Sequence, residues 1–303
     1  MITATLLLCG GTGLIGRALA QSLAHDGEQV ILLVRRPPRI HGDPKILEIE
    51  WHPERPQPLP DPARLEGCYA AVHLAGANLA SHRWTPAYKR LILSSRIDTS
   101  HALGRIFATL TAPPPVVVAA SATGYYGDRG NELLTEASRP GKGFLPEVCQ
   151  AWEASTSPLA PRVVQLRFGV VLTARGGALP RLLRLFRLGL GGQLGNGRQW
   201  MSWLSLQDAL AAIRFAIAES QLSGAFNTTA PHPVTNAEFT YTLGRILHRP
   251  TVFRVPSLVL RAALGEMAQA ALLASTRAVP ERLAAAGFFF SDERLEQTVS
   301  EMV

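Results

Sequence analysis

Residues 6–16 read LLLCGGTGLIG, an apolar run followed by glycines at positions 10, 13 and 16 and the start of a helical pattern. Glycine at 10 allows a sharp turn off a strand, glycine at 13 lets a phosphate approach the backbone, and glycine at 16 lets the helix pack closely. The free N–H groups and partial positive charge of the first helical turn favour an anion. The segment therefore predicts a strand, a phosphate-binding loop and a helix, which together begin a dinucleotide-binding βαβ unit.

Strand-like and helix-like segments alternate along the first half of the chain. Short apolar strands are expected at 5–9, 29–34, 69–74, 116–120 and 163–168, and helices at 14–25, 85–110 and 144–155. This alternation predicts an α/β fold with a doubly wound parallel sheet. The expected dinucleotide-binding domain is 1–175, with re-entry around 205–230. A smaller, mainly helical substrate domain is expected at 176–204 and 231–303.

The end of the second expected strand indicates which dinucleotide binds. A site for NAD(H) usually has an acid there that accepts from the ribose 2′-hydroxyl, but this chain has Arg35 and Arg36. Guanidinium groups form charge-assisted hydrogen bonds to a 2′-phosphate, so the pair predicts NADP(H). The alternative is that both arginines are solvated in a surface loop.

Further cofactor contacts are expected where the next strand ends. Small residues at Ala75 and Gly76 would let the backbone pass beneath the nucleotide, although ordinary strand-end packing gives the same pattern. Arg96, on the long helix, either reaches the nucleotide or is solvated. The complete set of expected cofactor contacts is Gly10, Thr12, Gly13, Leu14, Ile15, Gly16, Arg35, Arg36, Ala75, Gly76 and Arg96.

Composition narrows the classes of protein to consider. The 303 residues carry a net charge of +7, but the basic residues are scattered and lack interleaved aromatics, so a nucleic-acid partner is not expected. No apolar run is long enough to span a membrane, and Met1–Cys9 lacks the basic flank of a signal peptide and is interpreted as a strand. Three widely spaced cysteines indicate neither disulfides nor a metal site, which favours a cytoplasmic protein.

The chain resembles the extended short-chain dehydrogenase/reductase superfamily, and more narrowly its NAD-dependent epimerase-like branch with a characteristic helical C-terminal domain. The motifs that carry the resemblance are 10–16, HLAGAN at 73–78, SATGYYGD at 121–128, Trp152-Glu153, RFGVVL at 167–172, FRLGLGG at 186–192, VPERL at 279–283 and Gly287-Phe288. The resemblance covers essentially the whole chain. It implies a Rossmann fold, NADP(H) binding and an oxidoreductase or epimerase activity, without naming a substrate.

The superfamily's reaction uses a Tyr-x-x-x-Lys pair supported by Ser or Thr, in which the lysine lowers the tyrosine pKa and holds the nicotinamide ribose. This chain has no such pair. The residues four positions after its tyrosines are His73, Ile92, Arg129, Gly130 and Arg245. If Glu153 is aligned with the acid that commonly follows the pair, Leu145 and Cys149 occupy the tyrosine and lysine positions.

Replacement groups are expected on the loop after the strand at 116–120. Ser121 or Thr123 would bind a substrate carbonyl, and Tyr125 or Tyr126 would donate a proton. Alternatively, both tyrosines only form a wall of the pocket. Among other candidates, Cys149 is expected to be a packed thiol, His73 a satisfied structural histidine and Trp152 a core residue, while the aromatic strand Trp200–Trp203 is expected to line the substrate cleft.

Two functions follow from these patterns. The first is an NADP(H)-dependent oxidoreductase or epimerase-like enzyme for a small carbonyl or hydroxyl substrate. The second is a catalytically silent NADP(H)-binding sensor, which the missing lysine favours. The long helices are compatible with a homodimer, but nothing in the sequence requires one.

Overall fold

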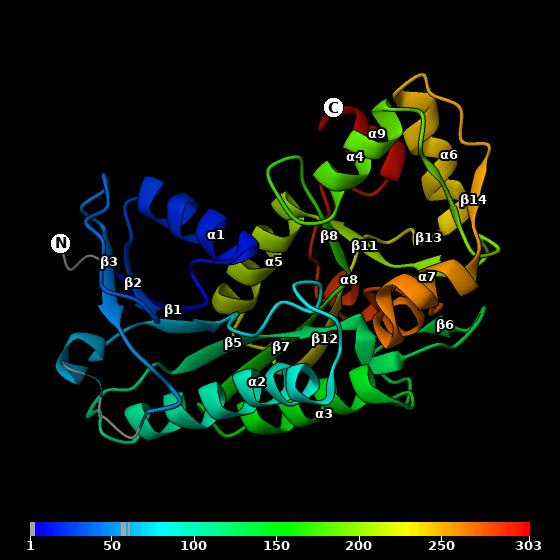
Figure 1. Cartoon of the computed structure of the whole chain (residues 1–303). Helices are drawn as coiled ribbons and strands as arrows, with labels where there is room; N and C mark the ends of the chain where they lie inside the picture. The colour runs from blue at the N-terminus through cyan, green and yellow to red at the C-terminus, as the bar shows by residue number, and fades with distance from the viewer. Residues whose placement is uncertain (1–3, 56–58, 60) are drawn as a thin grey trace.

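The structure, a computed structural model, describes residues 4–55, 59 and 61–303, so the first three residues of the interpreted strand Met1–Cys9 lie outside the description. Seven parallel strands form the central sheet in the order β12-β7-β5-β4-β1-β2-β3 (Figure 1). The strands are β1 (Thr5–Cys9), β2 (Gln29–Val34), β3 (Ile46–Glu50), β4 (Ala70–His73), β5 (Val116–Ala122), β7 (Arg162–Phe168) and β12 (Gly224–Thr228). The order reverses between β1 and β4, which confirms the doubly wound Rossmann fold.

Helices cover both faces of the sheet. In Figure 1, α1 (Leu14–His25) and α5 (Leu206–Ala218) lie on one side, and α2 (Pro86–Phe107) and α3 (Phe144–Thr156) on the other. Successive side chains of a strand point to opposite faces, so Leu6 and Leu8 pack beneath α1 and α5. Leu7 belongs to the separate cluster that α2 covers. Burial on both faces explains why these strands are continuous apolar runs.

The rest of the described chain forms short helices and two-stranded sheets beside the carboxyl edge of the main sheet. The helices and turns are α4 (Leu179–Arg187), α6 (Asn236–Ile246), α7 (Ser257–Leu264), α8 (Glu281–Ala285), α9 (Leu295–Ser300), η2 (Thr123–Tyr126) and η3 (Ala268–Leu272). The turn η1 (Pro62–Leu65) lies instead before β4, and its Leu65 packs in the cluster that α2 covers. The paired strands are β8 (Val170–Leu172) with β11 (Trp203–Ser205), β9 (Gly192–Leu194) with β14 (Phe253–Val255), β10 (Trp200–Met201) with β13 (Val234–Thr235), and β6 (Leu133–Leu134) with β15 (Arg277–Ala278). This region has a core of its own.

The expected aromatic strand Trp200–Trp203 is the clearest correction. It is divided between β10 and β11, which pair with different partners. Trp203 is fully buried, and its indole N–H donates to the His232 carbonyl 3.0 Å away. The prediction that this residue lines a cleft is therefore wrong, because the indole fills the core of the smaller region. Trp200, which is half-buried, hydrogen-bonds to Asn131 instead.

No helix in the described ranges is both long and apolar enough to cross a membrane.

Candidate dinucleotide and catalytic site

The glycine loop has the shape that a pyrophosphate requires. Gly10 has a φ of +91°, and a Cβ there would lie 2.6 Å from the Leu74 carbonyl carbon, because the chains leaving β1 and β4 pass close together. A Cβ on Gly16 would lie 2.4 Å from the Gly10 carbonyl oxygen, so the helix approaches the strand end closely. Both positions therefore require glycine.

Gly13 is different, because the space around it is open. A Cβ there would meet only the Gly10 oxygen, at 3.3 Å. Gly13 is the N-cap of α1, and that helix has neither a side-chain cap nor an acid in its first turn. Thr12 and Gly13 are exposed, and Leu14 and Ile15 are half-buried. The helix terminus is thus available to an anion, and the residues present fit the pyrophosphate of a dinucleotide.

The two arginines after β2 have different surroundings. Arg36 donates through both terminal nitrogens to the two carboxylate oxygens of Glu48, each at 2.7 Å. Burial alone would raise the pKa of Glu48, but hydrogen bonds from Arg36, the Arg39 backbone and His41 lower it to about 2. Arg35 is exposed and forms no hydrogen bond or ion pair with the residues described. Arg35 is therefore the freer cation of the predicted phosphate-binding pair.

The loop after β4 brings Ala75 and Gly76 to the glycine loop. A Cβ on Gly10 would lie 2.7 Å from the Ala75 nitrogen, so these two backbones are in contact. A Cβ on Gly76 would lie 3.0 Å from the Arg96 guanidinium carbon. Arg96 is only 9% exposed, which excludes the solvated alternative.

At the end of β4, His73 is buried and only half satisfied. Its Nε2 lies 3.2 Å from the Ser100 hydroxyl, while Nδ1 has no hydrogen-bond partner among the described residues. This burial agrees with the expected structural role. The expectation that both ring nitrogens are hydrogen-bonded does not hold, because Nδ1 has no described partner. Burial, reinforced by the nearby Arg96 charge, lowers the pKa of His73 to about 4.

We expect His73 to make folding stability depend on pH between about 6.5 and 4. As the pH falls through this window, His73 becomes protonated in the unfolded chain but stays neutral in the folded protein, so the free energy of unfolding decreases. The decrease amounts to about 3 kcal/mol. Urea unfolding of wild type and His73→Gln at pH 7 and 4.5 measures it, and an equal pH dependence in both proteins would contradict the assignment.

A buried ion pair joins the carboxyl end of β7 to α3, and a hydrogen bond ties the end of β5 to it. Arg167 of β7 donates from Nε and Nη2 to the two oxygens of Glu153 on α3, each at 2.8 Å. Ser121, the penultimate residue of β5, donates its hydroxyl to Glu153 Oε1 at 2.6 Å. Burial opposes the charge of Arg167, but the hydrogen bonds and charge of Glu153 raise the pKa of Arg167, so the guanidinium stays charged. Glu153 thereby fixes the orientation of the Ser121 hydroxyl.

The two adjacent tyrosines of η2 have opposite environments. Tyr126 is fully buried; its hydroxyl donates to Asn227 Oδ1 at 2.7 Å and accepts from Arg167 Nη1 at 2.9 Å. Tyr125 is half-buried with its ring 3.5 Å from the Arg167 guanidinium carbon, and its hydroxyl has no hydrogen-bond partner in the described chain. The Thr123 hydroxyl is likewise without a described partner. Tyr125 and Thr123 are thus the groups available to a ligand, whereas Tyr126 is committed to the fold.

The positions aligned with the missing tyrosine and lysine face this loop. A Cβ on Gly124 would lie 3.6 Å from Leu145 Cβ and 3.8 Å from Cys149 Sγ. Burial raises the pKa of Cys149 to about 12, so it is a packed thiol and carries no charge. Trp152, one turn further on, is 6% exposed and belongs to the core as expected. The pair is therefore absent from the structure as well as from the sequence.

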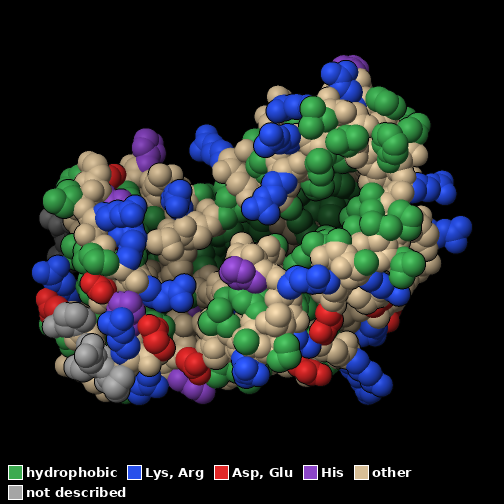
Figure 2. All heavy atoms as spheres, viewed as in Figure 1, with side chains coloured by type: hydrophobic (Ala, Val, Ile, Leu, Met, Phe, Trp, Pro, Cys, Tyr) green, Lys and Arg blue, Asp and Glu red, His purple; other side chains and the backbone are tan. Residues whose placement is uncertain are grey.

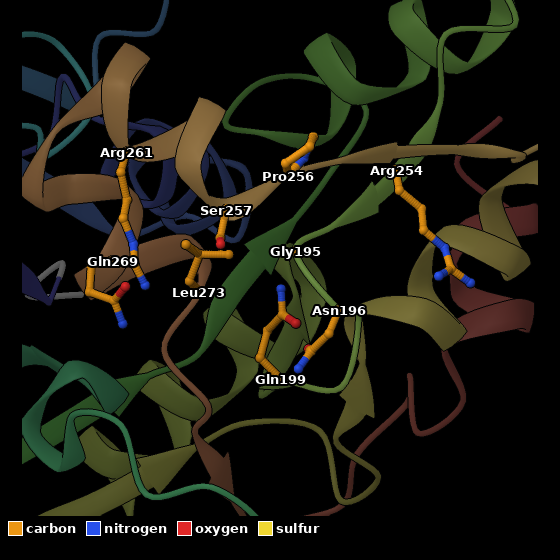
Figure 3. A pocket seen from close by; sticks show the side chains of 9 residues that line it. All are labelled: Gly195, Asn196, Gln199, Arg254, Pro256, Ser257, Arg261, Gln269 and Leu273. Carbon is orange, nitrogen blue, oxygen red and sulfur yellow. The ribbon is translucent and has the colours of Figure 1, made fainter.

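The surface of the molecule is hollowed in the smaller region. Figure 2 shows this hollow between the region of α4 and α6 and that of α7, with apolar side chains on its walls. Within the smaller region, a cavity of about 530 Å³ is bounded by the β9–β10 turn, α7 and η3 (Figure 3). Its polar lining comes from Asn196, Gln199, Arg254, Ser257, Arg261 and Gln269. The lining residues, all in the described chain, include two arginines and no acid.

Two partners in this site were missed by sequence reasoning. Glu48 lies on β3, which was not expected, and its carboxylate holds both terminal nitrogens of Arg36. Arg167 connects Ser121, Glu153 and both tyrosines, although it was noted only within a family motif. A charged residue within an apolar strand was the signal available in each case, since a buried charge requires a partner.

With the geometry established, comparison with known proteins defines the class. Residues 6–228 match the NAD dependent epimerase/dehydratase family, and residues 255–302 match a domain of unknown function, DUF1731. The chain belongs to the NAD dependent epimerase/dehydratase family. This membership confirms the resemblance that the motifs indicated.

Individual relatives resemble the chain along its whole length. The epimerase family protein Mb2239 of Mycobacterium bovis is 43% identical over 293 residues, which cover 96% of this chain and 94% of that protein. The epimerase family protein SA0724 of Staphylococcus aureus is 34% identical over 304 residues, with 98% of each covered. Among solved structures, the human epimerase family protein SDR39U1 (isoform 2) with NADPH has a TM-score of 0.86 at 32% identity, covering 98% of both chains.

Proposed function

We propose that this protein is an NADP(H)-dependent oxidoreductase or epimerase-like enzyme acting on a small carbonyl or hydroxyl substrate. The observation that carries the proposal is the free hydroxyl of Tyr125 beside the Ser121–Glu153–Arg167 network. This network lies at the same carboxyl edge of the sheet as the glycine loop, where doubly wound folds bind their ligands. A bound nicotinamide supplies the donor or acceptor of hydride for such a reaction.

Three residues of the chain would exchange the proton, bind the substrate and hold the proton donor in position. Tyr125 exchanges a proton with the substrate oxygen, because a phenol is a far stronger acid than the aliphatic hydroxyl of Thr123. The Ser121 hydroxyl donates a hydrogen bond to Glu153, which leaves its oxygen free to accept a hydrogen bond from a substrate hydroxyl. Arg167 holds the Tyr125 ring by a cation–π contact and neutralises Glu153.

The arginine-lined cavity supports a polar, anionic group on the substrate. Arg261 lies on α7 and Arg254 on β14, and neither forms an ion pair with a described residue. Gln199 uses its amide N–H groups on the Leu194 and Leu272 carbonyls, so its own carbonyl oxygen remains available as an acceptor. Uncompensated guanidinium groups favour carboxylate or phosphate.

We predict that Arg35→Ser lowers the affinity for NADPH about 10- to 100-fold and leaves that for NADH unchanged, because it removes a charge-assisted bond to the 2′-phosphate only. The human relative solved with NADPH supports this choice of cofactor. Fluorescence titration with both dinucleotides provides the measurement. Arg105→Ser, which removes an equal charge from an exposed site on α2, is the control. A wild type that prefers NADH would refute the NADP(H) assignment.

The second candidate function is the catalytically silent NADP(H) sensor. The observation that favours it is that Leu145 and Cys149, which take the tyrosine and lysine positions if Glu153 is aligned with the family's acid, are both buried. A screen of carbonyl and hydroxyl substrates, with and without phosphate or carboxylate groups, distinguishes the two when NADPH consumption is followed. Turnover of any substrate supports the enzyme. Tight NADPH binding without turnover across the screen supports the sensor.

A further inference from the structure

Arg96 is a buried cation without an acidic partner. It extends from α2, and its Nη1 donates to the carbonyl oxygens of Ile92 at 2.8 Å and Ala77 at 3.3 Å. Its Nε and Nη2 form no hydrogen bond with any residue that the structure describes, nor does the guanidinium form an ion pair there. Burying a guanidinium without an acidic partner costs free energy, because the charged form loses its hydration. The same loss of hydration lowers the pKa of Arg96. A function at this position would account for that cost.

The location of the guanidinium is informative. It packs against the backbone of Gly76, and it lies over the Trp152 ring with 4.7 Å between its carbon and the ring centroid. Its positive charge also acts on the Cys149 thiol, although burial dominates that group's pKa. Cys149 takes the lysine position if Glu153 is aligned with the acid that commonly follows the family's pair. A cation from α2 therefore lies in the neighbourhood where the superfamily has a cation from α3.

The strand order indicates which half of a dinucleotide this cation would meet. The arginines that follow β2 lie on one side of the switch point between β1 and β4. Gly76 follows β4, and Ser121 is in β5, so both lie on the other side. A dinucleotide anchored through its 2′-phosphate beside β2 and its pyrophosphate at the glycine loop must extend its other half across β4 and β5.

We propose that Arg96 supplies, from α2, the positive charge and hydrogen-bond donors that hold the nicotinamide-bearing ribose, the task that the superfamily gives to lysine. This inference rests on the proposed function. The free Nε and Nη2 donors suit the hydroxyl oxygens of a ribose. The carbonyls of Ile92 and Ala77 and the Trp152 ring fix the guanidinium in place before any ligand binds, so little side-chain entropy is lost on binding.

Two probes separate this role from the others. NADPH carries both halves of the dinucleotide, whereas 2′,5′-ADP carries the adenosine and the 2′-phosphate and lacks the nicotinamide half. Dissociation constants for both are measured by calorimetry on wild type, Arg96→Met and Arg96→Lys. We expect Arg96→Met to weaken NADPH about tenfold or more and to leave 2′,5′-ADP unchanged, and Arg96→Lys to recover most of the loss.

Each outcome has a defined meaning. Unchanged NADPH affinity in Arg96→Met, or equal weakening of both probes in a folded variant, would overturn the proposal. If Arg96→Met does not fold, Trp152→Leu removes the ring that holds the guanidinium and keeps the charge. It should weaken NADPH alone, and unchanged binding of both probes would again overturn the proposal. A wild type that binds neither probe would instead refute the proposed function itself.

Discussion

Replacing Gly13 by valine is expected to lower the affinity for NADPH by about two to four powers of ten with little change in stability. The backbone angles of Gly13, φ −75° and ψ 178°, suit any residue, and a Cβ there would meet only one protein atom within 4 Å. The side chain would instead fill the space in front of the first turn of α1. A pyrophosphate kept from that turn loses about two charge-assisted bonds of 1.5–3 kcal/mol each.

The contrast with neighbouring glycines makes the experiment specific. Gly16→Val should lose both binding and folding stability, because its Cβ would lie 2.4 Å from the Gly10 oxygen. Gly42→Val should change neither, since nothing lies within 4 Å of the added Cβ. NADPH titration and thermal unfolding of the three variants give the answer. NADPH binding that survives in Gly13→Val would show that this loop is not the pyrophosphate site.

The sequence was sufficient to predict the strand and helix that form the cofactor site, because each depends on a local pattern of residues. The predicted strand 5–9 and helix 14–25 match β1 and α1 residue for residue. By contrast, β3 was not expected. It is only five residues long, and the buried Glu48 there depends on partners up to twelve residues earlier, Arg36 above all. A short strand that depends on such a partner has no local signature.

The catalytic side of the site was predictable only as a set of candidates. Ser121, Thr123, Tyr125 and Tyr126 were all plausible, since each follows a buried strand. The four candidates differ in the contacts that their side chains make with residues far away in the sequence. Arg167 lies 41 residues from Tyr126, and Asn227 lies 101 residues away, yet these two side chains enclose the Tyr126 hydroxyl. The sequence of residues 121–128 contains no sign of these distant contacts. The two adjacent tyrosines, which have opposite roles, therefore could not be distinguished from the sequence.

Tyr125→Phe is expected to reduce turnover of any substrate found for this enzyme by two to four powers of ten, the usual effect of losing a positioned proton donor. The hydroxyl that the variant lacks has no hydrogen-bond partner in the described chain, and phenylalanine keeps the ring over Arg167. The free energy of unfolding and the affinity for NADPH should therefore match those of wild type. Steady-state rates, urea unfolding and cofactor titration on the same preparation measure all three quantities.

Tyr126→Phe is the matched control, because it removes the same atom one residue further on. Here the loss leaves Asn227 Oδ1 without its hydroxyl donor and Arg167 Nη1 without its acceptor, both in a buried place. The expected cost is about 1–3 kcal/mol of unfolding free energy, with turnover close to wild type below the unfolding transition. If Tyr126→Phe lowers turnover and Tyr125→Phe lowers only stability, the Tyr125 hydroxyl is not the proton donor. If turnover survives both changes, neither tyrosine is, and the proton must pass through Thr123 or a bound water.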